Sequence, residues 1–491
     1  MVVGQVGNSF KREPLEDHLQ RCNGKTLGEL DQTGIFESLK DKPKRTGVAG
    51  DVVEQSVLFL KPNSKQEPDI VVDGVRFEVK TTGVRKSKDR HSLWVAKEPM
   101  SITAVSPNAI TAEDYPKSSF WHKIEHILFF YYHYDSNKAV KAIEYSRFNL
   151  LDYQFHDYSD FTSDEREMLE GDWLRVRNFI DYLQKTYGDK CKDEYPRISH
   201  ELRQTLLLLD TAPKWPNPPR FRFKRTFVSS ILERHFSKKR LEKLPTTLTN
   251  YRDLDDACAY LKAKYAGKTV AELCRTFNIP VSKKLKSITE PIIVKMFGGK
   301  SNSMRKVEFF SKVGVWGKSF VVTEEGGRTE DAKFFTIDFD EFLDDAISFE
   351  DSQFCEFFSS TRLLVAVFKE PSTLAPLADN RFVGFKTLVF DDKFIETHVK
   401  PVWLRVRELI QTNTLRDVPV LDKTGKQKVN KNGELSSAPN FPKSSEGVVF
   451  VRGTGTDSRD KRERVNGIRM YYQQVWMRGD CLAEFTAISD R

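Results

Sequence analysis

In the segment EPDIVVDGVRFEVKTT (residues 67–82), the charged side chains Asp69, Glu78 and Lys80 lie beside alternating apolar residues. Side chains alternate along a strand, so Glu78 and Lys80 share one face. Carboxylate oxygens are preferred ligands of Mg²⁺, and a nearby ammonium group can orient an attacking water and stabilise charge developing on a phosphate. The residue types and their spacing therefore suggest metal-dependent hydrolysis of a phosphodiester.

The same segment predicts a β-hairpin. Asp73-Gly74 between two alternating apolar runs is typical of a type I′ turn. A two-residue turn pairs Ile70 with Phe77 and so sets Asp69 opposite Glu78. Like charges in opposite positions destabilise a hairpin by roughly 0.2–1 kcal/mol, so something must offset the repulsion.

A bound divalent cation would offset it. Upstream, DVVEQSVLFL (residues 51–60) predicts an amphipathic helix that carries Glu54 as a further acidic group. A surface hairpin with an ordinary Glu–Lys pair would explain an isolated ExK sequence. The combination of Pro-Asp, the hairpin, an apolar opposite face and the helical Glu54 favours a nuclease site.

Composition bounds the remaining classes of protein. A chain of 491 residues predicts two domains. Apolar runs are too short for a membrane span, and the start lacks the apolar region of a signal peptide, so we expect a cytoplasmic protein. Six cysteines without CxxC pairs and nine histidines without ligand spacing argue against zinc, and no phosphate-binding GxxxxGK[ST] loop is present. The net charge of +8 mildly favours a polyanionic partner.

The sequence also contains an internal repeat, in which three segments recur in the same order about 240 residues later. The pairs are GKTLGEL (24–30) with GKTVAEL (267–273), HILFFYY (126–132) with RLLVAVF (362–368), and WLRVR (173–177) with WLRVR (403–407). We therefore expect domains at residues 1–243 and 244–491, with the polar stretch 421–447 exposed or partly disordered.

Pro68-Asp69, eight residues and then Glu78-Val79-Lys80 resemble the PD-(D/E)xK nuclease motif. The order of the surrounding segments resembles MutH and the Sau-type restriction endonucleases that cut at GATC. The similarity extends over nearly the whole chain in two copies. It implies an α/β (α+β) protein of two tandem restriction-endonuclease-like domains, each a central mixed sheet flanked by helices.

The resemblance implies roles for individual residues. Glu54, Asp69, Glu78 and the Val79 carbonyl would bind Mg²⁺, and Lys80 would serve catalysis. Other residues are expected to contact DNA, either from the resemblance or because they lie among basic and aromatic residues. They are Arg45, Lys123, Lys214, Lys224, Arg225, Lys318 and Arg452. An arginine expected before Pro213-Lys214 is absent, and Thr46 stands at a family lysine, so the target is GATC or a related short site.

The second half lacks the catalytic residues at the matching positions. Lys318 and Phe320 stand at the positions that match Glu78 and Lys80. Phe309, with Glu308 beside it, stands at the position that matches Asp69, and the region that matches Glu54 contains Val294 and Lys295. We expect this half to bind DNA without cutting it. The resemblance implies an allosteric effector that engages a second site and promotes cleavage by the first half; a decayed duplicate retained for folding is the alternative.

The leading hypothesis is a Mg²⁺-dependent type II restriction endonuclease that cuts double-stranded DNA, acts as a dimer or by looping two sites, and has a cognate DNA methyltransferase. A mismatch-repair-type nicking endonuclease is the second enzyme hypothesis. The third is a non-catalytic DNA-binding protein in which the hairpin is purely structural.

Overall fold

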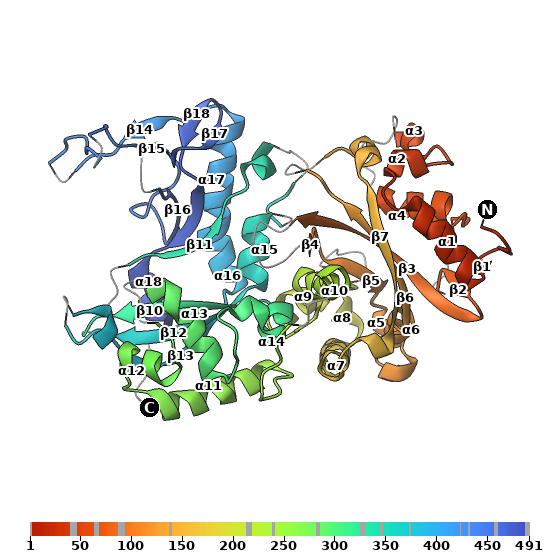
Figure 1. Ribbon diagram of the computed structural model, residues 1–491, viewed down its shortest axis with the longest axis horizontal. Helices are drawn as coiled ribbons and strands as arrows, with labels where there is room; N and C mark the ends of the chain where they lie inside the picture. Colours follow the sequence, from red (N-terminus) through yellow and green to blue (C-terminus); the bar gives the residue numbers. More distant parts are fainter. Residues whose placement is uncertain are drawn as a thin grey trace.

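The computed structural model describes most of the chain. The described residues are 2–39, 47–62, 68–86, 94–136, 140–212, 219–237, 241–280, 285–324, 330–343, 347–350, 352–372, 375–422, 424–430, 433–455 and 460–486. All structural statements below concern these residues. The first half lies on the right of Figure 1 and the second half on the left.

A mixed sheet forms the centre of the first half, with strand order β1-β2-β3-β6-β7 and β4 paired to the end of β3. The central pair β3 and β6 is parallel, whereas β2 and β7 run antiparallel to their neighbours. A second, antiparallel sheet has the order β5-β9-β8. The strands are β1 Ser9–Phe10, β2 Ile70–Val72, β3 Val75–Lys86, β4 Trp94–Ala96, β5 Met100–Ala104, β6 His126–His133, β7 Leu150–Asp157, β8 Leu209–Ala212 and β9 Arg220–Phe223.

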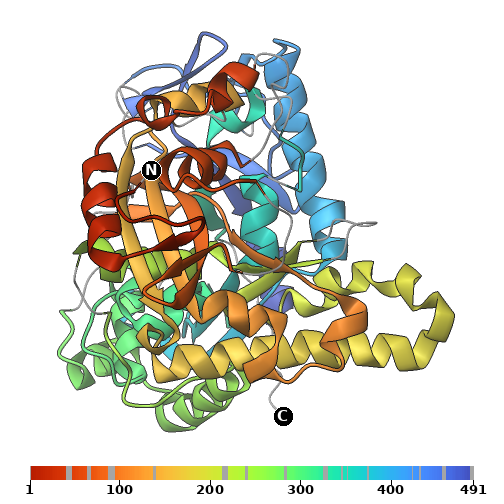
Figure 2. The same ribbon diagram turned by 90° about the vertical axis from the view of Figure 1, so that its right-hand side faces the viewer.

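Strand β6 is apolar on both faces because both faces of the central sheet are covered. Leu128 and Phe130 join a core with the N-terminal helices, and Phe129 and Tyr131 join a core with α7 and α10. Helix α7 runs beneath the sheet and projects beyond it (Figure 2). The helices of this half are α1 Arg12–Cys22, α2 Leu27–Leu30, α3 Ile35–Ser38, α4 Val48–Val52, η2 Val53–Val57, α5 Pro107–Ile110, α6 Ser119–Ile124, α7 Ser163–Tyr187, α8 Cys191–Glu194, α9 Pro196–Leu202 and α10 Arg225–Ser237, with short 3₁₀ turns η3 to η6 between them.

The second half has the same strand directions. Its central sheet is β10-β12-β13, with β10 and β12 parallel and β13 antiparallel, and its small antiparallel sheet is β11-β19-β16. In both small sheets the strand that comes last along the chain, β19 or β9, lies in the middle. The strands are β10 Val315–Val322, β11 Ala332–Thr336, β12 Arg362–Lys369, β13 Arg381–Leu388, β14 Asp417–Pro419, β15 Ser437–Pro439, β16 Val449–Gly453, β17 Glu463–Val465, β18 Ile468–Met470 and β19 Gln473–Met477.

The helices of the second half follow a similar order along the chain. They are α11 Tyr251–Tyr265, α12 Val270–Thr276, α13 Leu285–Met296, α14 Glu308–Val313, α15 Gln353–Ser360, α16 Asp392–Phe394, η10 Ile395–Val399, α17 Lys400–Gln411 and α18 Gly479–Thr486, with 3₁₀ turns η7 to η9 between them. Among the described residues, every helix is too short or too polar to span a bilayer.

The repeated segments make the same backbone contacts in both halves. Leu27 N donates to Phe148 O across 2.8 Å, and Val270 N donates to Asn380 O across 2.9 Å. In each case the helix begins with a capping box, Thr26 with Glu29 and Thr269 with Glu272. The two copies of WLRVR lie on α7 and α17, and the tryptophan of each is buried.

The two halves are joined by polar contacts as well as a shared core. Asp392 accepts from His200 Nδ1 and from Arg203 Nη1, across 2.5 and 3.0 Å. Lys312 of α14 lies 3.6 Å from the buried Glu165 of α7. One apolar core includes residues of both halves.

The described part of residues 421–447 is largely exposed, as predicted, and it is ordered. The described part of this stretch continues the antiparallel ribbon β14–β15, with further bridges Leu421 to Gln427 and Val429 to Leu435. Because the ribbon satisfies its own backbone groups, a polar composition did not prevent ordered strand pairing here.

Candidate active site

The predicted hairpin is present in the predicted register. Ile70 pairs with Phe77, and Asp73 and Gly74 have φ values of 48° and 87°, as a type I′ turn requires. The ladder begins at Ile70, so Asp69 lies just before strand β2. The hairpin brings Asp69 and Glu78 to the same end of the sheet.

Glu78 is buried, with 4% of its surface exposed, and contacts two lysines. Lys80 Nζ donates to Glu78 Oε1 across 2.7 Å, and Lys123 Nζ donates to Oε2 across 2.6 Å. Lys123 comes from the short helix α6, which the Ser118 side chain caps. In this structure the lysines supply the positive charge that offsets the carboxylate repulsion expected from the sequence.

Asp69 faces the start of the reactive strand. Its Oδ2 accepts from Val79 N across 2.8 Å, which orients the carboxylate toward β3. Burial raises its pKa, and the nearby Glu78 raises it further, while the Val79 hydrogen bond, Lys80 and Lys123 oppose the shift. The hairpin thus places Asp69 and Glu78 close enough for their charges to interact.

Glu54 belongs to the same environment, but its element differs from the prediction. The expected amphipathic helix is α4 followed by a π-helical turn, η2, and Glu54 is the second residue of that turn. Such turns are frequent at functional sites. Burial raises the pKa of Glu54 to about 7, and Asp69 is the next largest cause.

The donor set suits a divalent cation. Mg²⁺ takes carboxylate oxygens, and an ionised carboxylate has about four lone-pair sites, so the two lysine contacts leave Glu78 able to bind a cation. Within the described ranges, however, no three His, Cys, Asp or Glu side chains are grouped closely enough to hold a metal as they stand. Glu54, Asp69 and Glu78 are therefore neighbours of suitable chemistry and do not form a completed metal site.

A mixed sheet that presents two or three acids and a lysine at one end defines a nuclease-like site. Residues 58–165 match the model of the family described as DNA mismatch repair enzyme MutH. The chain thus contains a MutH-like domain with a restriction-endonuclease-like fold. The match includes Asp69, Glu78, Lys80 and Lys123 and begins after Glu54. No curated protein matches the chain.

Five residues of the first half are predicted to contact DNA: Arg45, Lys123, Lys214, Lys224 and Arg225. Arg45 and Lys214 lie outside the described residues, as does Thr46. Lys123 is 8% exposed and holds Glu78, so its charge is directed at a carboxylate instead of a phosphate. Sequence reasoning missed this role because nothing local to Lys123 indicates that Glu78 faces it.

Lys224 and Arg225 make contacts within the protein. Lys224 is 6% exposed and its Nζ donates to Leu206 O across 2.6 Å, so its ammonium group faces a buried backbone carbonyl. Arg225 Nε lies 2.5 Å from Glu356 Oε1 of the second half. The basic and aromatic pattern of this segment reflects core packing and a contact between the halves.

The corresponding place in the second half has different chemistry. Phe309 and Phe320, which the repeat aligns with Asp69 and Lys80, are buried. Lys318 Nζ donates to Lys333 O across 2.9 Å. Arg452 of β16 is exposed and lies 2.8 Å from Asp331, with its guanidinium over the Trp476 ring.

Proposed function

We propose that the chain is a Mg²⁺-dependent type II restriction endonuclease that makes double-strand cuts in DNA at GATC or a related short site in the cytoplasm. The observation that carries the proposal is the shared electrostatic environment of Glu54, Asp69 and Glu78 beside Lys80, largely within the segment that matches MutH. Carboxylates with a lysine two residues on form a set that can bind a cation and act on a phosphate.

The residues would divide the work as follows. Glu54, Asp69, Glu78 and the Val79 carbonyl would hold Mg²⁺, which when bound supplies a Lewis acid and lowers the pKa of a coordinated water. Lys80 would lie near the scissile phosphate and would stabilise the negative charge that develops there. Lys123 keeps Glu78 in place, and Val79 N fixes Asp69.

For the second half we propose DNA binding without cleavage and an effector role at a second copy of the site. The repeated strand order and the matching backbone contacts of Leu27 and Val270 support a duplicated MutH-like domain, with boundaries at 1–243 and 244–491. Lys318 in place of Glu78 removes a negative charge that would repel phosphates. Cleavage by a dimer or by looping two sites, and a methyltransferase that protects the host sites, complete the proposal.

A second candidate function has a specific observation behind it, because the matching family is described as a mismatch repair enzyme. An enzyme of that kind would nick one strand. The two-copy architecture favours the restriction enzyme, because two DNA-binding units can engage two copies of a site, whereas nicking one strand requires binding at one site only.

The test is incubation of the purified protein with supercoiled plasmid, unmethylated and adenine-methylated, with Mg²⁺ or with EDTA. Linear DNA with defined ends supports the restriction enzyme, and open circles alone support the nickase. Glu78→Ala should abolish cleavage, whereas Asp73→Asn, which changes an exposed acid in the same hairpin, should not. Intact plasmid under every condition would overturn both enzyme proposals and leave a DNA-binding protein.

A further inference from the structure

Two arginines lie directly opposite each other on a small hairpin of the second half. Strands β17 and β18 pair in a register that sets Arg464 against Arg469, around a turn in which Asn466 and Gly467 have φ values of 49° and 78°. Like charges in directly opposite positions destabilise a hairpin. Neither arginine forms an ion pair with an acidic side chain among the described residues, so the fold itself does not offset this repulsion.

The hairpin is anchored on its other face. Val465 and Met470 are buried in the core of the second half, and side chains alternate, so Arg464 and Arg469 face outward. Arg469 donates through Nε and Nη2 to Lys461 O, across 3.4 and 3.3 Å. The two guanidinium groups are thus displayed from a fixed support.

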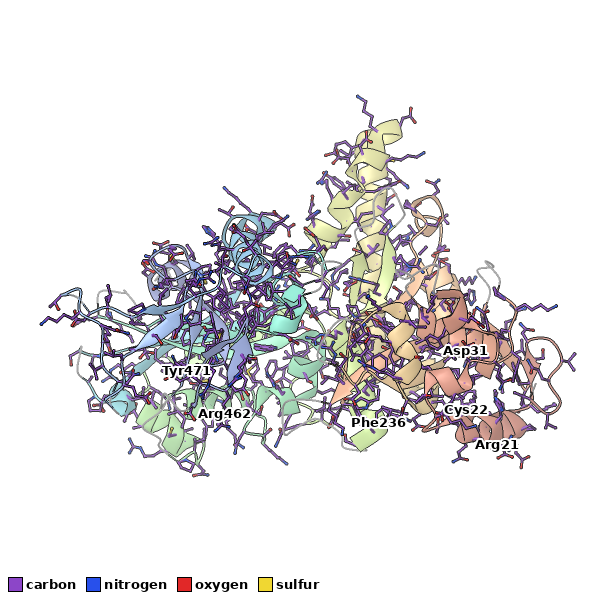
Figure 3. All side chains as sticks on the ribbon, turned by 90° about the horizontal axis from the view of Figure 1, so that it is seen from above. Arg21, Cys22, Asp31, Phe236, Arg462 and Tyr471 are labelled. Carbon is purple, nitrogen blue, oxygen red and sulfur yellow. The ribbon has the colours of Figure 1, made fainter. Side chains whose placement is uncertain are left out.

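The surroundings of the hairpin are basic. Residues 460–478 contain five lysines and arginines and two acids. Arg462 has a side chain that is 72% exposed, and Tyr472 is 50% exposed. Figure 3 shows Arg462 and Tyr471, which flank the hairpin, in the second half and far from Asp31 and Cys22 of the first.

The position of the hairpin in the repeat is informative. It lies in the connection from β16 to β19, residues 454–472, which joins the outer strand of the small sheet to its middle strand. The first half makes the equivalent connection from β8 to β9 with the short stretch 213–219, which includes Lys214. The connection is therefore longer in the second half, and its described part forms the β17–β18 hairpin.

We propose that the β17–β18 hairpin is a phosphate-binding clamp through which the second half holds duplex DNA. Guanidinium groups bind phosphates in a bidentate manner, and a phosphate between Arg464 and Arg469 would replace their mutual repulsion by attraction. The site rests on the proposed function, because the MutH-like domain makes nucleic acid the polyanion that best fits this surface. In this proposal the hairpin contacts the phosphates of the DNA and does not recognise bases.

The test measures binding of the full-length protein to a fluorescent duplex in EDTA over a range of KCl concentrations. Arg464→Gln with Arg469→Gln should reduce the slope of log K against log salt by about 2, since each lost phosphate contact removes about 1. Arg464→Lys with Arg469→Lys should keep the slope. The matched control is Arg252→Gln with Arg275→Gln, which removes two exposed charges from α11 and α12 at the opposite end of this half in Figure 1.

An unchanged slope in the glutamine variant would overturn the clamp, and so would an equal loss in the matched control. Unchanged DNA binding would leave an acidic protein as the partner of the hairpin. Plasmid cleavage by the wild type separates the two proposals. A wild type that cleaves, combined with an unchanged slope, removes only the clamp, whereas a reduced slope with no cleavage keeps the clamp and removes the nuclease.

Discussion

Lys123 donates a hydrogen bond to Glu78 across 2.6 Å, and both side chains are buried. Glu78 also accepts from Lys80, so two ammonium groups hold one carboxylate at the end of the reactive strand. Lys80 is the more exposed of the two lysines. We infer that Lys123 positions Glu78 and that Lys80 is the residue closer to the chemistry.

Lys123→Met should slow DNA cleavage about 10–100-fold, because the loss of a partner that orients a metal ligand has effects of this size. The KM for DNA should change little, since Lys123 does not face solvent. Lys117→Met, at an exposed position in the segment that leads into α6, is the control and should behave as wild type. Weaker DNA binding with unchanged turnover would show that Lys123 contacts DNA after all. Steady-state cleavage of a plasmid substrate gives both quantities.

Lys318→Ala and Arg452→Ala test the second half. Both should weaken DNA binding, by about fivefold for Arg452, because a phosphate contact contributes on the order of 1 kcal/mol at moderate salt. Both should also slow cleavage while Mg²⁺ binding in the first half stays intact, which titration calorimetry measures. Arg405→Ala, on the exposed face of α17, is the control. Unchanged plasmid cleavage in both variants would contradict an effector role.

Asp392→Asn tests the connection between the halves. Asp392 holds both His200 and Arg203 of the first half, so neutralising it should lower the free energy of unfolding by about 1–2 kcal/mol. The two halves should then unfold in less coincident transitions, followed by tryptophan fluorescence in urea. Asp379→Asn, an exposed acid of the same half, should have no effect. A single unshifted transition in Asp392→Asn would show that the shared core alone couples the halves.

The sequence predicted features that depend on local rules. The Asp73-Gly74 turn and the Ile70–Phe77 pairing follow from turn chemistry and the period of a strand, and both are present. Tertiary packing decided the features that it did not predict. Three features depend on residues distant in sequence: the π-helical turn at Glu54, the burial of Lys224 and the Lys123–Glu78 contact. The sequence around a lysine does not show whether its side chain is buried or exposed.

His156 provides a test of pH dependence that is independent of the metal site. It is 2% exposed and packs edge-on against Phe161. Burial, the largest cause, lowers its pKa to about 4, and Arg234 lowers it further, although Asp160 raises it. Histidine in the unfolded chain titrates near 6.5. The unfolded state therefore binds the proton more readily, so this group costs no stability above pH 6.5 and lowers stability progressively as the pH falls from 6.5 to 4.

His156→Phe should remove that loss, because phenylalanine retains the ring contact and has no proton to bind. The free energy of unfolding of the variant, relative to that of wild type, should increase as the pH falls, by an amount on the order of 3 kcal/mol near pH 4. Above pH 6.5 the difference between the two proteins should be nearly constant. Urea unfolding across this pH range measures it. His122→Phe, at a half-exposed position on α6, should show no such gain. Parallel pH profiles for wild type and His156→Phe would mean that the ring is protonated in the folded protein.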